Sequence, residues 1–259
     1  MEETPANEHL PRDYVSIDVY SIGCVAVATL LVVSSMCTLL HKRLAVPMHE
    51  KRQRIPRRAF FVALLHISTG APIVMFYAAE HVEQQWQVSS SWYGRLLRSS
   101  WAEHSTAGLE LWVAGSFVLQ QAICLCLLCL FLDTWFYWTH RLLHTRWLYK
   151  RVHYVHHTFT HTRSWCAFYA HPLEFYIGNL AGVFGLPFLV PGYVLPVHKV
   201  TFMAWAWTCQ VVTMFSHSGL TQLGADVHGK HHTLYKCNYG TNMFWDALLK
   251  TGNWDAKAE

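Results

Sequence analysis

Long apolar runs separated by short polar segments dominate the first half of the chain. Runs at 19–40, 59–79 and 111–138 each have roughly the 20 residues that a helix needs to cross a bilayer. A Gly-Ala-Pro break at 70–72 lies inside the second run and predicts a bend there, because proline cannot continue the helical hydrogen bonds. The pattern predicts three membrane-spanning helices, with an interfacial loop or a surface helix over 80–110.

A fourth apolar region, 175–197, is interrupted repeatedly by glycine and proline. These interruptions predict two half-length pieces in place of one straight helix. The next apolar run, 199–215, is predicted to return to the face from which 175–197 entered. The sequence therefore predicts a membrane hairpin, and from Ser216 onward the chain becomes polar, aromatic and rich in histidine.

A basic stretch, 41–43 together with 51–58, separates the first two apolar runs. Under the positive-inside rule it is predicted to be a cytosolic loop. Counting spans from that loop places the end of the third span and both ends of the hairpin on the same cytosolic face. We therefore expect an all-α integral-membrane bundle of about three spans plus a hairpin, with a cytosolic histidine-rich helical cap. The expected domains are a flexible N-terminus at 1–14, membrane-anchoring helices at 15–110 and a catalytic domain at 111–259.

Composition agrees with a membrane protein. The chain of 259 residues is 53% hydrophobic and 14% charged, against roughly 25% charged in soluble domains. Its twelve Trp and twelve Tyr suit the membrane–water boundary. The net charge of +4 is too weak and too scattered to indicate a nucleic-acid partner. The eight cysteines lie mostly in apolar runs and are predicted to be reduced core residues instead of a disulfide or zinc framework.

Histidine is the anomaly in this composition, since twelve of the eighteen fall between His140 and His232. Three boxes, at 140–144, 153–157 and 228–232, repeat histidine at spacings of three or four residues, which place side chains on one face of a helix. Single histidines are more often ordinary, so the joint pattern carries the prediction. The candidate metal ligands are His140, His144, His153, His156, His157, His171, His217, His228, His231 and His232. The role of His161, between two boxes, is left open.

Ten candidate ligands exceed the four of a structural zinc site. They suit two adjacent metal ions with about five nitrogens each and dioxygen between them, although imidazole alone does not choose between zinc, copper, iron and nickel. Carboxylates that could orient the rings, or that could equally be capping or solvated groups, are Asp133, Glu174, Asp226 and Asp246. Aromatic residues predicted to line the path of an apolar substrate, or simply to pack, are Trp135, Tyr137, Trp165, Phe168 and Tyr169.

Over 132–252 the sequence resembles the fatty acid hydroxylase superfamily, also called the sterol desaturase family. The order and spacing of the boxes carry the resemblance, together with short segments around them. Those segments are Asp133 to His144, Leu148 to His157, Ala170 to Glu174, His217-Ser-Gly, His228 to His232, Cys237 to Gly240 and Phe244-Trp-Asp246.

The resemblance implies an endoplasmic-reticulum membrane enzyme in which the boxes hold two iron ions. It further implies that dioxygen is used with electrons from NADPH or NADH, delivered through cytochrome b5 or a reductase. The chain contains no His-Pro-Gly-Gly haem motif, so the donor is expected to be a separate protein. The implied reaction is hydroxylation or desaturation of a sterol or another lipid-like apolar substrate, with the histidines as ligands only.

The subfamily stays open, because different segments resemble different members. Residues 170–174 resemble C-4 methyl sterol oxidases and sphingoid-base hydroxylases, and 216–219 resemble sterol 25-hydroxylase-like members. Residues 195–199 and 238–246 are closer to sterol C-5 desaturases. Two alternatives remain: a metal transporter or metal-binding membrane protein, and a family member that oxidises or isomerises a specialised metabolite.

Overall fold

The computed structural model describes residues 18–43, 57–101, 107–160, 162–220 and 226–253, with only the backbone for 88–101, 107–114, Lys42 and Asp226. The described chain contains helices and no strand, which confirms the predicted all-α class. The elements are α1 (Val19–Arg43), α2 (Arg57–Leu65), the π-helix η1 (His66–Gly70), α3 (Ala71–Trp101), α4 (Ala107–Leu143), α5 (Arg146–Arg151), the 3₁₀-helices η2 (His153–Thr158) and η3 (Ser164–Phe168), the π-helix η4 (Glu174–Leu180), α6 (Ala181–Phe184), α7 (Leu186–Leu189), α8 (Lys199–Ser216), α9 (Asp226–Leu234) and α10 (Phe244–Leu248).

Three of the described helical stretches are long and apolar enough to cross a membrane. They are Val19–His41, Arg57–Gln87 and Gly115–Leu143, at the three positions that the hydrophobic runs predict. The predicted bend in the second stretch takes the form of the π-turn η1, in which Ala71 N–H bonds to His66 O. Pro72 follows directly and has no N–H to continue the regular ladder.

Residues 80–101, predicted as a loop or a surface helix, continue α3 as one helix up to Trp101. Residues 102–106 lie outside the described part of the chain. The described part of 80–110 is therefore helical, but it continues α3 and, from Ala107, begins α4 instead of forming a separate surface helix.

The predicted hairpin is present, with its first arm broken as expected. That arm consists of η4, α6 and α7, and α6 and α7 have only four residues each. The return arm, α8, has 18 residues and packs against α1 and α3, while α6 and η4 pack against α4. The buried core of the bundle includes Leu30 of α1, Ala78 of α3, Leu128 of α4 and Phe202 of α8.

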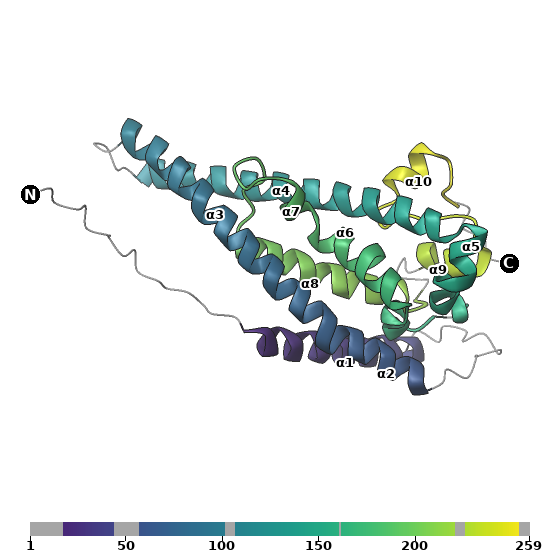
Figure 1. Ribbon diagram of the computed structural model, residues 1–259. Coiled ribbons are helices and arrows are strands. Elements are labelled where there is room, and N and C mark those ends of the chain that lie inside the picture. The colour runs from purple at the N-terminus through teal and green to yellow at the C-terminus, as the bar shows by residue number, and fades with distance from the viewer. Residues whose placement is uncertain (1–17, 44–56, 102–106, 161, 221–225, 254–259) are drawn as a thin grey trace, which may run out of the picture.

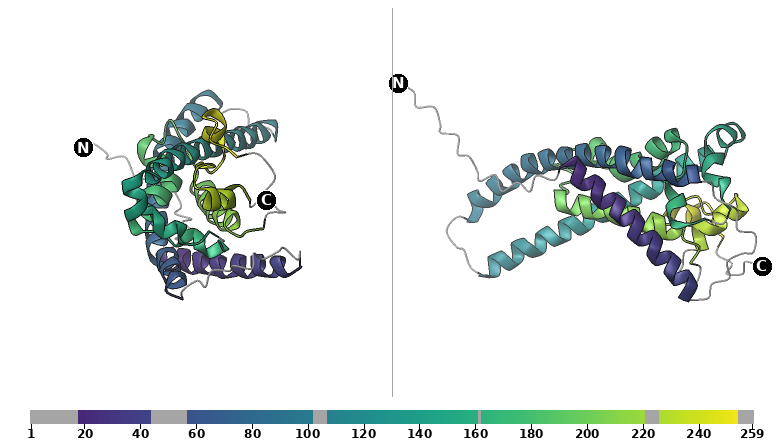
Figure 2. Two further views of the ribbon diagram at one scale, coloured as in Figure 1. Left: turned by 90° about the vertical axis from the view of Figure 1, so that its right-hand side faces the viewer. Right: turned by 90° about the horizontal axis from the view of Figure 1, so that it is seen from below.

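The histidine-bearing segments gather at one end of the bundle. Figures 1 and 2 place α5, α9 and α10 together there, beside the C-terminal ends of α1 and α4. His41 at the end of α1 contacts the Ser218 carbonyl oxygen at 2.7 Å, directly after His217. The predicted convergence of the basic loop's flanks with the histidine boxes on one face is thus visible in the fold.

All eight cysteines are free, which agrees with the reduced state that the sequence predicts. Cys37, Cys124, Cys166 and Cys209 are buried, but Cys24 and Cys126 are exposed. These two therefore do not belong to the core, because they lie on the outer face of long apolar helices instead of the inner one.

Candidate metal centre

The first histidine box lies at the C-terminal end of α4. The helix extends through Leu143, and His144 N bonds to His140 O at 3.1 Å. The two side chains are therefore one turn apart on one face, as predicted. Their ring centroids are 5.1 Å apart.

The second box forms a 3₁₀-helix, η2, with His153, His156 and His157 all buried. The third box lies on α9, where His231 and His232 have no exposed surface. His217 directly follows α8 as its C-cap residue, and it is also buried. Nine of the ten candidate ligands thus come from α4 with the residue after it, η2, α9 and the end of α8.

These nine histidines form two groups. Within each group, the possible ligand atoms all lie within 4.8 Å of one another. The five-histidine group contains His140, His144, His153, His157 and His231, and the four-histidine group contains His156, His217, His228 and His232. Each H-x-x-H-H box is divided between the two groups. The groups therefore adjoin, and the rings of His157 and His232 are centred 4.6 Å apart.

Four of the nine histidines are held by a hydrogen bond from ring Nδ1 to a backbone carbonyl oxygen. The pairs are His140 with Tyr239 (2.8 Å), His231 with Cys237 (2.7 Å), His217 with Thr213 (2.8 Å) and His156 with Tyr169 (3.3 Å). A carbonyl oxygen only accepts, so Nδ1 must carry the hydrogen. The lone pair of each neutral ring is then on Nε2, the atom that faces the other histidines.

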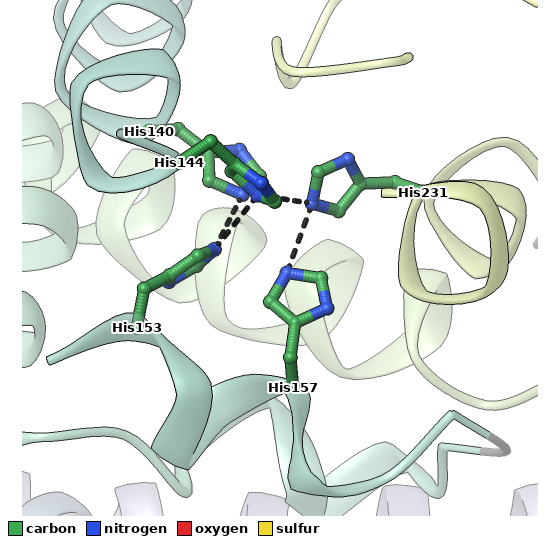
Figure 3. A group of neighbouring side chains, drawn as sticks. All are labelled: His140, His144, His153, His157 and His231. Atoms are coloured by element: carbon green, nitrogen blue, oxygen red, sulfur yellow. Dashed lines mark hydrogen bonds between the residues drawn. The ribbon is translucent and has the colours of Figure 1, made fainter. Parts of the chain in front are cut away.

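The Nε2 atoms of the five-histidine group meet head to head (Figure 3). The distance is 3.1 Å for His140–His153, His153–His144, His144–His231 and His231–His157. Neutral rings that already donate from Nδ1 cannot satisfy all of these contacts by hydrogen bonds, so lone pairs oppose one another. Two ligands at right angles around one ion at about 2.1 Å would be about 3.0 Å apart. The donor set therefore fits a metal ion.

The four-histidine group has the same chemistry with fewer protein partners. His217 Nε2 lies 3.3 Å from His156 Nε2. Both ring nitrogens of His232 and the Nε2 of His228 are buried without a hydrogen-bond partner. Buried polar atoms normally have partners, so these orphaned nitrogens also fit metal coordination.

Burial keeps the imidazoles neutral at physiological pH. It lowers the pKa of His144 and of His156 to about 4, and the pKa of His217 and of His231 to about 3. Desolvation is the main cause in each case, and nearby imidazoles add to it for three of them. The pKa values of His153, His157, His228 and His232 are also far below the ordinary value for the same reason. Neutral rings are the form that binds metal.

Glu174, at the start of η4, is the one predicted orienting carboxylate among those with a described side chain that touches a candidate ligand directly. Its Oε1 lies 2.9 Å from His153 Nδ1. Burial raises the pKa of Glu174 well above its usual range, and its Oε2 has no hydrogen-bond partner. A carboxylate in such a place needs a nearby positive charge, which a metal ion on the far side of His153 would supply.

His171 is placed outside both groups. Its Nδ1 accepts a hydrogen bond from Leu173 N at 3.2 Å, which is a local contact at the turn before η4. The proline and leucine that follow it start the hairpin instead of turning the ring toward the boxes. His161, and the side chain of Asp226, lie outside the described residues.

Asp133 and Asp246 are fully buried and touch no histidine. Asp133 accepts hydrogen bonds from the backbone N–H groups of Thr241 and Asn242 at 2.7 and 2.6 Å. Asp246 accepts from Tyr239 N and Gly240 N at 3.0 and 2.6 Å. Asp133 thus holds residues 241 and 242, whereas Asp246 holds residues 239 and 240, whose shared peptide contacts His140 through the Tyr239 oxygen.

The predicted aromatic residues have different settings. Tyr137 is buried and hydrogen-bonded, and Trp135 Nε1 donates to Ile177 O at 2.7 Å. Trp165 and Phe168 pack in or against the core, and Tyr169 supplies the carbonyl oxygen that orients His156. Packing is the role that these contacts describe. Sequence reasoning missed the four carbonyl acceptors, because a backbone oxygen leaves no trace in the side-chain pattern.

Residues 125–251 match the fatty acid hydroxylase family. The chain carries a fatty acid hydroxylase domain. The matched residues contain all ten predicted ligands, and they nearly coincide with the segment on which the resemblance rested. No solved structure matches the chain significantly.

Curated relatives of this fatty acid hydroxylase domain include sterol oxidases. The C-4 methylsterol oxidase erg25 of Schizosaccharomyces pombe is 34% identical over 131 residues, and methylsterol monooxygenase 1 of Danio rerio is 37% identical over 131 residues. In both comparisons the match covers 46% of this chain and 43% of the relative. A very-long-chain aldehyde decarbonylase of Oryza sativa subsp. japonica is 38% identical over 107 residues, 37% of this chain and 34% of that protein. The chain therefore aligns with less than half the length of these relatives.

Proposed function

We propose that this chain is a membrane-bound oxygenase whose nine clustered histidines hold two iron ions and which hydroxylates a sterol. The observation that carries the proposal is the convergence of buried Nε2 lone pairs in two adjoining groups. The domain assignment and the methylsterol monooxygenases among the relatives support the reaction class and the sterol. When bound, the irons would supply the redox chemistry that activates dioxygen against a C–H bond.

The residues of the chain contribute binding and orientation in this proposal. His140 and His231 are fixed by carbonyl oxygens of the C-terminal segment, and His153 by Glu174. His217 and His156 are fixed from α8 and from the segment after η3. Four segments of the chain thus hold the rings in place, and the burial of the rings would exclude bulk water from the metal ions.

The electrons are proposed to come from NAD(P)H through a separate cytochrome b5-type donor. The histidine-bearing end exposes Arg141, Arg146, Lys150 and Arg151. The described carboxylates of the same end, Asp133, Glu174 and Asp246, are all buried. The exposed charge there is positive among the described side chains, which suits a donor with an acidic face.

We propose the endoplasmic-reticulum membrane as the location, with the histidine groups and the C-terminus in the cytosol. The three apolar helices and the sterol oxidases among the relatives support this. A metal transporter is the second candidate. The groups lie at one end of the bundle and not midway along it, whereas transporters place their ligands near the bilayer midplane on broken helices, so the oxygenase is favoured.

The test is product formation by the full chain in lipid nanodiscs, loaded with Fe(II) and supplied with ¹⁸O₂, NADPH, a reductase and cytochrome b5. A panel of 4-methyl sterols and other sterols serves as substrate. We expect a sterol that gains one labelled oxygen. His156→Ala and His231→Ala should each lower the rate by about 100-fold or more, since loss of an orienting group alone costs 10–100-fold.

His171→Ala is the matched control, because it removes an imidazole outside both groups. It should keep full metal content and a rate within about threefold of wild type, as expected for a side chain that touches no ligand. A product that has lost two hydrogens and carries no labelled oxygen would show that the reaction is a desaturation and not a hydroxylation. Absence of any dioxygen-dependent product from metal-loaded protein would contradict the oxygenase proposal and favour metal-flux assays.

A further inference from the structure

Asp246 is a buried carboxylate that accepts three hydrogen bonds. The donors are Gly240 N at 2.6 Å, Thr251 Oγ1 at 2.7 Å and Tyr239 N at 3.0 Å. The side chain of Asp246 touches no histidine. Its role at the edge of the metal centre must therefore differ from that of Glu174, which contacts His153 directly. The bond to Gly240 N is the shortest of the three.

One peptide group joins Asp246 to the metal centre. The peptide between Tyr239 and Gly240 accepts at its oxygen from His140 Nδ1, at 2.8 Å, and donates at its N–H to Asp246 Oδ2, at 2.6 Å. The peptide is a planar, conjugated unit, and hydrogen bonds in a chain polarise one another. A carboxylate on the N–H side therefore makes the carbonyl oxygen a stronger acceptor for His140.

We propose that Asp246 is a positioning residue for His140 that acts through the Tyr239–Gly240 peptide, so that metal binding by the five-histidine group depends on this carboxylate. The inference rests on the proposed metal centre and deepens it. Histidine ligands commonly donate their second N–H to a carboxylate directly. Here a single peptide group is interposed between carboxylate and imidazole.

Gly240 fits this arrangement for a steric reason. A Cβ atom at this position would lie 2.7 Å from Asp133 Oδ1 and 3.0 Å from Asp246 Oδ2. Both distances are shorter than ordinary contacts, so any side chain would push the carboxylates away from the peptide. The glycine allows two buried carboxylates to approach one turn of backbone.

The other backbone carbonyl oxygens that contact ligand histidines are not backed by a carboxylate. The carbonyl of Cys237, which holds His231, belongs to a peptide whose N–H, that of Asn238, donates to Thr251 O at 3.0 Å. In the four-histidine group, His217 and His156 bond to plain backbone carbonyls. Among the described side chains, carboxylates therefore support only the five-histidine group, through Glu174 and Asp246.

A chain of hydroxyl groups connects Asp246 to a surface cation. Arg141 donates to Tyr137 Oη at 2.9 Å, and Tyr137 Oη contacts Thr251 Oγ1 at 3.1 Å. Thr251 Oγ1 in turn donates to Asp246 at 2.7 Å. Since Thr251 uses its hydrogen on Asp246, Tyr137 must donate to Thr251. The buried carboxylate thus has an oriented donor path from a positive charge.

The test is zinc binding by the full chain in nanodiscs, measured by titration of metal-free protein with Zn²⁺ against a competing chelator. Wild type should bind two ions. Asp246→Asn should weaken one of the two binding steps by about 10-fold or more and leave the other within about twofold, by analogy with lost orienting carboxylates. An asparagine cannot accept all three bonds, because its amide NH₂ would face one of the donors.

Asp133→Asn is the matched control. Asp133 is equally buried and also accepts from three backbone N–H groups, those of Thr241, Asn242 and Trp245. None of those peptides bonds to a histidine ring. Asp133→Asn should lower the unfolding temperature and leave both zinc constants as in wild type. Equal zinc constants in Asp246→Asn and wild type, or the same one-site loss in both variants, would overturn the proposal.

Gly240→Ala is the second variant, for use if Asp246→Asn does not accumulate as folded protein. It keeps every histidine and both carboxylates but displaces the carboxylates from the peptide, so the same single-site weakening is expected. Wild-type zinc constants in this variant would contradict the inference. Zinc binding is separate from activity. If wild type bound two zinc ions and Asp246→Asn weakened one binding step, but no dioxygen-dependent product formed, the oxygenase proposal would fail and the inference about Asp246 would stand.

Discussion

In each buried imidazole of the two groups, one ring nitrogen is hydrogen-bonded to the rest of the protein or has no hydrogen-bond partner. The other ring nitrogen faces the neighbouring imidazoles. The head-to-head Nε2 contacts of 3.1 Å would be repulsive between lone pairs. Protonation of the rings does not relieve this repulsion at physiological pH, because burial and neighbouring rings lower the pKa values of His144 and His231. At the scale of single residues, the site is therefore built to favour metal ions over protons.

This protonation behaviour predicts acid sensitivity of the metal-free protein. His144 and His156 have pKa values of about 4 in the fold and about 6.5 in an unfolded chain. As the pH falls below 6.5, the unfolded chain binds protons first, so stability is complete above that pH and is lost progressively down to about pH 4. We expect the unfolding temperature in detergent to be about 5 °C or more lower at pH 5 than at pH 7.5.

The zinc-loaded protein is the control for this measurement. Zinc on Nε2 competes with protons, so the loaded protein should keep its unfolding temperature down to about pH 6, below the pH at which the metal-free protein begins to lose stability. An unfolding temperature of the metal-free chain that stays constant from pH 7.5 to pH 5 would contradict the predicted burial of neutral imidazoles.

At the scale of elements, the turn between α7 and α8 is docked tightly onto α3 and α4. Gly192 N donates to Gln85 Oε1 at 2.7 Å, and His198 N donates to Gln121 Oε1 at 2.9 Å. Lys199 at the start of α8 pairs with Glu80 at 2.6 Å. These contacts fix the hairpin at the end opposite to the histidines. The hairpin in turn carries Glu174 at one end and His217 at the other.

Gly192→Ala should loosen this docking. A Cβ atom there would lie 2.6 Å from Gln85 Cβ and 2.8 Å from Gln85 O, and the backbone atom cannot move aside freely. We expect a loss of about 1–3 kcal/mol, the usual cost of overpacking, seen as an unfolding temperature lower by several degrees. Gly115→Ala is the control, since a Cβ atom on that residue of α4 meets nothing within 4 Å. It should be neutral or slightly stabilising. Equal effects of the two variants would contradict the docking.

At the scale of the whole molecule, the long helices bring both candidate groups to one end. α1 and α4 finish there and α2 begins there (Figure 1). The contact of His41 with Ser218 O joins the end of α1 to the residue after His217. The basic residues near these helix ends predict that this end of the bundle faces the cytosol. This orientation can be measured directly.

We predict that the two chain termini lie on opposite sides of the membrane. With an epitope tag at either end of the chain, protease added to sealed microsomes should remove a C-terminal tag and leave an N-terminal tag intact until detergent is added. The physical reason is the odd number of candidate spans in the described part of the chain, three, combined with a hairpin that returns to its own side. Protection of both tags, or cleavage of both, would contradict this topology.

Much of this architecture can be predicted from the sequence, because it depends on local patterns. Apolar run length predicts the three long helices, and proline and glycine predict the turn η1 and the broken arm of the hairpin. Histidine spacing in the three boxes identifies eight residues that the fold brings together, and the position of His217 beside the hairpin identifies the ninth. The same position beside the hairpin also selected His171, which the fold places outside both groups, because a residue's place along the chain does not fix the direction of its ring.

What only the tertiary structure decided is the division of the histidines and the support behind them. His156 and His157 are neighbours in sequence, yet they belong to different groups, because adjacent residues on a helix point in different directions. The link from His140 through the Tyr239–Gly240 peptide to Asp246 joins α4 to a turn about 100 residues away. Such a link uses backbone atoms that every residue has, so its position depends on how the chain folds and not on residue types alone.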